Sequence, residues 1–63
     1  MRLTDFWRRM EERFGVSYAH SVSADYRLTQ LGSTVDDALA RGVETREIWR
    51  AVCAEFDMPA HLI

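Results

Sequence analysis

The large apolar side chains of this chain are concentrated in two short stretches, one near each end, and both have helical spacing. The first stretch contains Leu3, Phe6, Trp7, Met10 and Phe14. The second contains Ile48, Trp49, Val52, Cys53 and Phe56. Because a helix turns once in about 3.6 residues, each set gathers on one side of its helix. Both tryptophans and all three phenylalanines belong to these two stripes, so we expect the two helices to pack together.

Capping signals set the expected ends of the first helix. Thr4 can cap its first turn, and Gly15 can end it, because glycine adopts the left-handed conformation at low cost. Asp5 and Arg9 are four residues apart, which predicts a weak ion pair on the helix surface.

The segment between the stripes predicts two further helices. Ser17 is expected to cap a helix that ends at Leu31-Gly32. Its apolar residues fall on two faces, so it either bends near residues 23–25 or packs against neighbours on two sides. One face carries Tyr18 and Val22, and the other carries Ala24, Leu28 and Leu31.

The second half of the chain contains clearer start and stop signals. Thr34 is expected to begin a short third helix that Gly42 stops. The last helix begins at Glu44 or Thr45 and frays before Pro59, which disfavours helix at the preceding residue.

The predicted fold class is therefore all-α: a compact bundle of three to four short helices, with a helix-turn-helix-like second half. The chain has 63 residues and begins with Met1, and we expect one small helical domain over residues 1–63. Domains of this size bury only about 60% of their unfolded surface, so they are marginally stable without a cross-link such as a disulfide or without a second copy of the chain.

Cysteine content and hydropathy predict a cytoplasmic protein. Cys53 is the only cysteine, so no disulfide can form within the chain. Residues 1–14 are charged and amphipathic, unlike the apolar core of a signal peptide. No stretch approaches the roughly 18 apolar residues of a membrane-spanning helix, and we expect no membrane partner.

No catalytic or metal-binding motif is recognisable in this sequence. Cys53 lies on the apolar side of its helix, as expected of a packed, inert thiol. His20 and His61 have no local partner that would make a nucleophile or a metal site, and Asp25 is five residues from His20, off the spacing of one helical turn. We therefore expect no enzyme activity, no cofactor and no metal.

Residues 34–52 partly resemble a helix-turn-helix with Gly42 in the turn. In that interpretation Arg46 and Arg50 face outward, where arginine can pair with guanine or phosphate. Glu47 shares their face, and the net charge of −2 gives no general attraction to nucleic acid. DNA binding, or an accessory role in DNA processing, is an alternative that we do not favour.

Four residues are candidates for contact with a protein partner. Tyr18 and Tyr26 are eight apart and can frame one exposed edge of a helix. Leu62 and Ile63 end the sequence with apolar side chains, which either fold back onto the core or meet a partner. The leading hypothesis is a non-catalytic helical interaction module with an unknown protein partner, for which a second copy of this chain is one candidate.

Three blocks cover most of the chain: LTDFWRRMEERFG at 3–15, TVDDALARGV at 34–43 and EIWRAVCAEFDMP at 47–59. They closely resemble a family of actinobacterial proteins of about this length, known as domain of unknown function 3046. The family pattern has an Asp-Pro pair opening the last helix, where this chain has Glu44-Thr45.

The resemblance implies a helical, cytoplasmic, actinobacterial protein. The family has no established activity, so no catalytic residues carry over. Its members are often encoded near recombination genes, which favours the DNA-linked alternative slightly.

Overall fold

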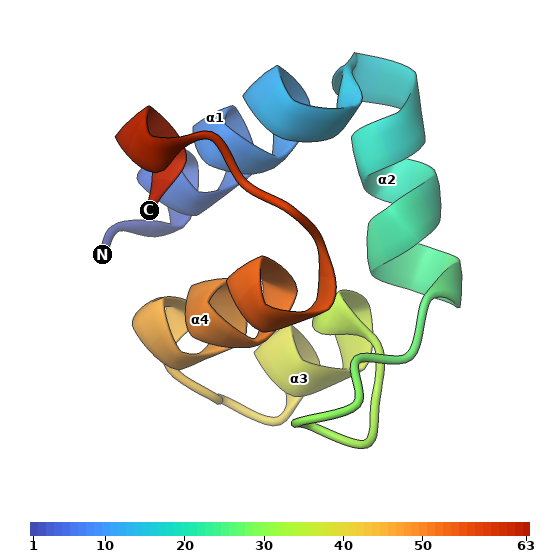
Figure 1. Cartoon of the computed structure of the whole chain (residues 1–63). Coiled ribbons are helices and arrows are strands. Elements are labelled where there is room, and N and C mark those ends of the chain that lie inside the picture. The colour runs from blue at the N-terminus through green and yellow to red at the C-terminus, as the bar shows by residue number, and fades with distance from the viewer.

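Four α-helices and one short 3₁₀ turn make up the structure, a computed structural model that describes all residues, 1–63. They are α1 (Leu3–Phe14), α2 (Val16–Asp25), α3 (Val35–Ala40), α4 (Thr45–Glu55) and the 3₁₀ turn η1 (Ala60–Leu62). In Figure 1, α2 continues from α1 at an angle, α3 lies beside α4, and the segment after α4 returns to α1. The predicted all-α bundle is confirmed. None of the helices combines the length and apolar character needed to cross a bilayer.

The predicted packing of the two aromatic stripes is also confirmed. Phe6 of α1 is fully buried, and its ring lies edge-on to that of Trp49 on α4, with 5.9 Å between ring centroids. Trp7 meets the same phenylalanine edge-on at 5.5 Å. Trp49 is buried, whereas Trp7 is half-buried and stacks on the His20 ring of α2. Such edge-to-face pairs add stabilisation beyond the area that they bury.

A second aromatic cluster closes the other end of the α1–α4 contact. Phe56, directly after α4, lies edge-on to Phe14 at the end of α1, with 5.0 Å between centroids. Tyr26 also packs on Phe56, with 4.8 Å between ring centroids, and Tyr18 contacts Phe14 at 6.0 Å. The last residues of three helical segments therefore meet around two phenylalanines.

Gly15 joins α1 to α2. Its φ of 86° is in the range that favours glycine, its N–H donates to the Glu11 carbonyl at 2.7 Å, and its carbonyl accepts from Ala19 at 2.9 Å. One residue thus ends the first helix, as predicted, and begins the second. The predicted cap at Ser17 is wrong because α2 already starts at Val16.

The start of α1 also differs from expectation. The helix begins at Leu3, so Thr4 lies inside the first turn instead of capping it. The predicted Asp5–Arg9 pair does not form. Asp5 pairs with Arg8 at 3.4 Å, and Arg9 reaches the C-terminal segment instead.

The second helix is shorter than the sequence predicted. It ends at Asp25, and Leu28 and Leu31 belong to a turn. The Leu28 N–H donates to the Ser33 carbonyl at 2.9 Å, which forms an isolated antiparallel bridge. Leu28 is buried from this turn. Ala24 is exposed, so the helical spacing from Ala24 to Leu28 marks neither a shared buried face nor a continuing helix.

Glu55, the last residue of α4, holds the turn that follows α2. Its carboxylate accepts a hydrogen bond from the Tyr26 hydroxyl at 2.9 Å and another from the Thr29 N–H at 3.1 Å. The Thr29 backbone bond, followed by the Tyr26 bond, lowers the pKa of Glu55. The hydrogen bond to Glu55 raises the pKa of Tyr26.

The signals around α3 and α4 are largely as expected. The third helix starts at Val35, one residue after the predicted Thr34, and the Thr34 hydroxyl caps it by accepting from the Asp37 N–H at 3.1 Å. Gly42, with φ of 83°, lies in the turn before α4. Glu44 occupies the cap position of α4 without a side-chain bond. The Thr45 hydroxyl instead donates to the carbonyl of Met1.

Hydrogen bonds from side chains of α1 and α4 hold the segment that follows α4. The Trp49 indole N–H donates to the Leu62 carbonyl at 2.8 Å, and Arg13 donates to the Asp57 carbonyl, also at 2.8 Å. His61 contacts the Glu12 carboxylate. Of the two alternatives left open by the sequence, Leu62 folds back into the core and is 4% exposed.

We expect Trp49→Phe to reduce the free energy of unfolding by about 1–2 kcal/mol, because it removes the indole donor to Leu62. Trp7→Phe is the matched control and should cost less, since no hydrogen bond of the Trp7 indole is lost. Urea unfolding followed by circular dichroism measures both. Equal losses would mean that the Trp49 hydrogen bond contributes nothing.

Glu55→Gln should remove part of the pH dependence of stability. The pKa of Glu55 is lowered from its ordinary 4.5. The ionised carboxylate therefore contributes to the free energy of unfolding above that value, and this contribution is lost as the pH falls through the folded-state pKa. The free energies of unfolding of wild type and variant should therefore differ near neutral pH and converge in acid. Urea titrations across this range test it, with Glu47→Gln as a control on the same helix. Parallel curves for wild type and Glu55→Gln would contradict the role of the carboxylate.

Candidate functional site

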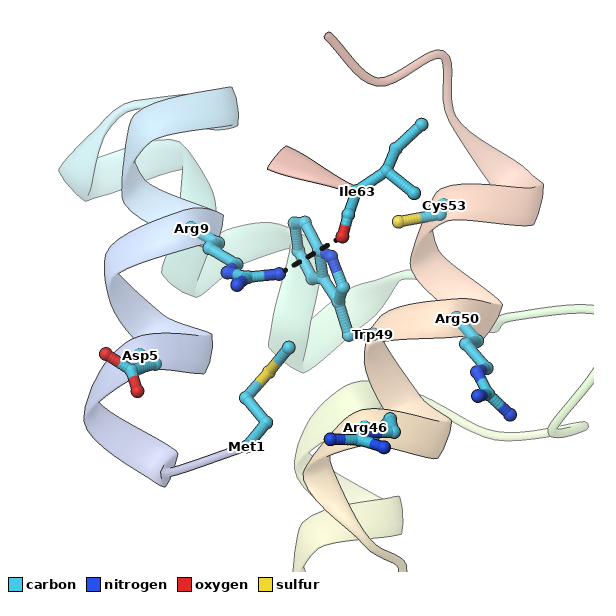
Figure 2. A pocket seen from close by; sticks show the side chains of 8 residues that line it. All are labelled: Met1, Asp5, Arg9, Arg46, Trp49, Arg50, Cys53 and Ile63. Carbon is cyan, nitrogen blue, oxygen red and sulfur yellow. Dashed lines mark hydrogen bonds between the residues drawn. The ribbon is translucent and has the colours of Figure 1, made fainter. Parts of the chain in front are cut away.

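An open pocket of about 470 Å³ lies where α1, α4 and the two ends of the chain meet. Figure 2 shows its lining, which comes from residues far apart in the sequence. The polar members are Asp5, Arg9, Arg46 and Arg50, and the others are Met1, Trp49, Cys53 and Ile63. The side chains of the lining carry three guanidinium groups against one carboxylate, so their summed charge is positive, whereas the chain as a whole has a net charge of −2.

Arg9 is the anchored cation of the pocket. Its Nη1 donates to the Leu62 carbonyl at 3.2 Å and to the main-chain oxygen of Ile63, the last residue of the sequence, at 3.4 Å. Figure 2 draws the second of these bonds beside the Trp49 ring. Two bonds from one nitrogen leave Nε and Nη2 with no partner in the protein. The guanidinium is therefore held in place while one edge of its fork stays free.

Arg46 and Arg50 lie one turn apart on α4, and both are exposed. Neither makes a hydrogen bond or ion pair within the chain. In Figure 2, Arg46 extends toward the Met1 side of the pocket, whereas Arg50 points away from α1. Five other arginines donate to carbonyl, hydroxyl or carboxylate oxygens: Arg8, Arg9, Arg13, Arg27 and Arg41.

The predicted tyrosine edge exists but differs in its two members. Tyr18 is 61% exposed, and with Tyr26 it lines a shallow hollow of about 190 Å³ on α2. The Tyr26 hydroxyl is already engaged by Glu55. Of the apolar pair at the end of the sequence, Ile63 is exposed and lines the large pocket, while the buried Leu62 is not available at the surface.

The remaining titratable residues named from the sequence do not converge. His20 stacks on Trp7, whereas His61 contacts Glu12. No group of three or more histidine, cysteine or acidic side chains is placed to hold a metal ion. Cys53 lines the pocket in a half-buried position. Burial raises the pKa of its thiol, and the charge of Arg9 offsets this only in part.

The sequence singled out Arg46 and Arg50 as candidate DNA contacts but gave no sign that Arg9 lines the same pocket. The spacing of Arg9 pointed to Asp5, whereas its actual partners are main-chain oxygens more than 50 residues away. No local pattern reports such a contact.

The structure thus defines a small all-α domain with one cationic pocket. A family model, described as "Protein of unknown function (DUF3046)", matches residues 1–61. The chain belongs to this family, as the three sequence blocks indicated. No curated protein and no solved structure matched the chain.

We expect the Cys53 thiol to react more slowly with Ellman's reagent in the folded protein than in the urea-unfolded chain at neutral pH. Its raised pKa lowers the fraction of thiolate, and half-burial restricts access. Absorbance of the released thiolate measures the rate, with glutathione as a reference thiol. A folded-state rate above that of the unfolded chain would indicate an activated cysteine.

Proposed function

We propose that this protein is a non-catalytic interaction module that binds another protein at the pocket between α1 and α4. The observation that carries the proposal is the pair Arg46 and Arg50, which are exposed, unpartnered and adjacent at the rim of that pocket. Most other arginines of the chain are already used by internal contacts. Two free guanidinium groups beside a fixed third one leave strong donors available to a partner.

The environment of the candidate nucleophile supports a binding role over catalysis. A reactive cysteine needs a lowered pKa and a nearby base. Burial raises the pKa of Cys53, and His20 and His61 each contact a residue outside the pocket. The pocket therefore offers donors for binding but no paired acid and base.

The proposal predicts that substitution at the pocket rim abolishes capture of a partner. Tagged wild type, Arg46→Gln/Arg50→Gln and Arg2→Gln/Arg27→Gln would serve as baits in an extract of the source organism. The control removes the same charge outside the pocket lining. We expect a protein retained in near-stoichiometric amount by wild type and control and lost with the rim variant. If untagged copies of this chain are the retained species, the partner is a second copy.

Failure to retain any protein with the folded wild-type bait would contradict the interaction role. Circular dichroism of all three baits shows whether each is folded, so that loss of capture by the rim variant is not caused by unfolding.

A helix-turn-helix-like DNA binder is the second candidate, because Arg46 and Arg50 are exposed on α4 as that hypothesis requires. Two observations weigh against it. Recognition helices contact base edges with their N-terminal residues. Here the Thr45 hydroxyl, at the start of α4, is bonded to the Met1 carbonyl. In addition, α3 has only six residues, of which Asp36 and Asp37 are exposed.

A further inference from the structure

The pocket between α1 and α4 combines a fixed cation with two adjustable ones. Arg9 is held by the Leu62 and Ile63 oxygens through Nη1 alone. Its Nε–Nη2 edge presents two parallel N–H donors, the arrangement that pairs with both oxygens of a carboxylate. Arg46 and Arg50 have no internal contact to break before they reach a ligand.

Apolar groups flank these donors. Met1 is 36% exposed, Ile63 is 74% exposed, and both line the pocket. A ligand with only a charge would leave these side chains in water. A ligand that carries an apolar side chain next to its acid would cover them and gain from their burial.

We infer that the pocket binds an acidic peptide segment of the partner, with a glutamate or aspartate side chain paired to Arg9 and Arg46. Arg50 would contact a second acidic residue of the segment, and Met1 and Ile63 would contact a neighbouring apolar side chain. The inference rests on the proposed function and adds the chemistry of the partner.

The surroundings favour a peptide over a nucleic acid. Nucleic-acid binders neutralise many phosphates along a positively charged track. Here the unpartnered cations of the pocket are two, Glu47 is exposed on the same helix, and the chain has a net charge of −2. A concave site bordered by apolar side chains suits one or two carboxylates of a peptide better than the phosphate backbone of a nucleic acid.

A fluorescein-labelled oligoglutamate peptide with one internal leucine is the probe, and fluorescence anisotropy at low salt is the measurement. We expect saturable binding to wild type that weakens about tenfold in Arg46→Gln/Arg50→Gln, since each exposed ion pair contributes modestly. The control Arg2→Gln/Arg27→Gln should change affinity less than about twofold. An oligolysine peptide with the same leucine should not bind.

Chemical-shift mapping of the same titration locates the site. The Trp49 indole N–H and the Arg9 side-chain N–H signals should shift with oligoglutamate. Arg9→Lys keeps the charge but loses the paired N–H donors of the guanidinium, so it should weaken binding. The other signals of this variant should keep the dispersion of a folded protein.

Three results would overturn the inference: no binding of oligoglutamate, equal binding by the rim variant and its control, or tighter binding of a labelled oligothymidylate. The last would identify a nucleic-acid ligand. If baits capture a partner at the rim while oligoglutamate fails, the interaction role stands and only the acidic chemistry is wrong. If capture fails as well, both are wrong.

Discussion

The packing of Phe6 against Trp49 is the contact on which the rest of the fold depends. It joins α1 to α4, which are separated by most of the sequence, and it does so through a fully buried ring. Trp7 extends the same contact to α2 through its stack on His20. The buried core has only 12 apolar residues, and Phe6 and Trp49 are its only aromatic members, so losing this contact would remove the bulkiest part of that core.

The same packing places the components of the candidate site. With its indole ring held against Phe6, Trp49 directs its N–H to the Leu62 carbonyl and so fixes the C-terminal segment. Arg9, one turn further along α1, then finds two main-chain oxygens of that segment within reach. The pocket therefore exists only in the folded chain, because its lining comes from both ends of the sequence (Figure 2).

The sequence predicted the elements that depend on local chemistry. Helical spacing identified α1 and α4, and Thr34 and Gly15 marked real boundaries. The prediction from sequence was wrong where tertiary contacts determine the local structure. Leu28 continues a helical pattern, yet a turn held by the Glu55 carboxylate buries it.

The same limit applies to the candidate site. Arg46 and Arg50 could be predicted to face outward because helical spacing places them away from the apolar stripe of α4, although the sequence suggested them as DNA contacts. Arg9 could not be identified in this way, because main-chain acceptors have no sequence signature.

The most direct test of the Phe6–Trp49 packing is a nuclear Overhauser spectrum of the protein in solution. We expect cross-peaks between the Phe6 ring and the Trp49 indole, together with a slowly exchanging Trp49 indole N–H. Absence of these cross-peaks, with rapid exchange of that proton, would contradict it.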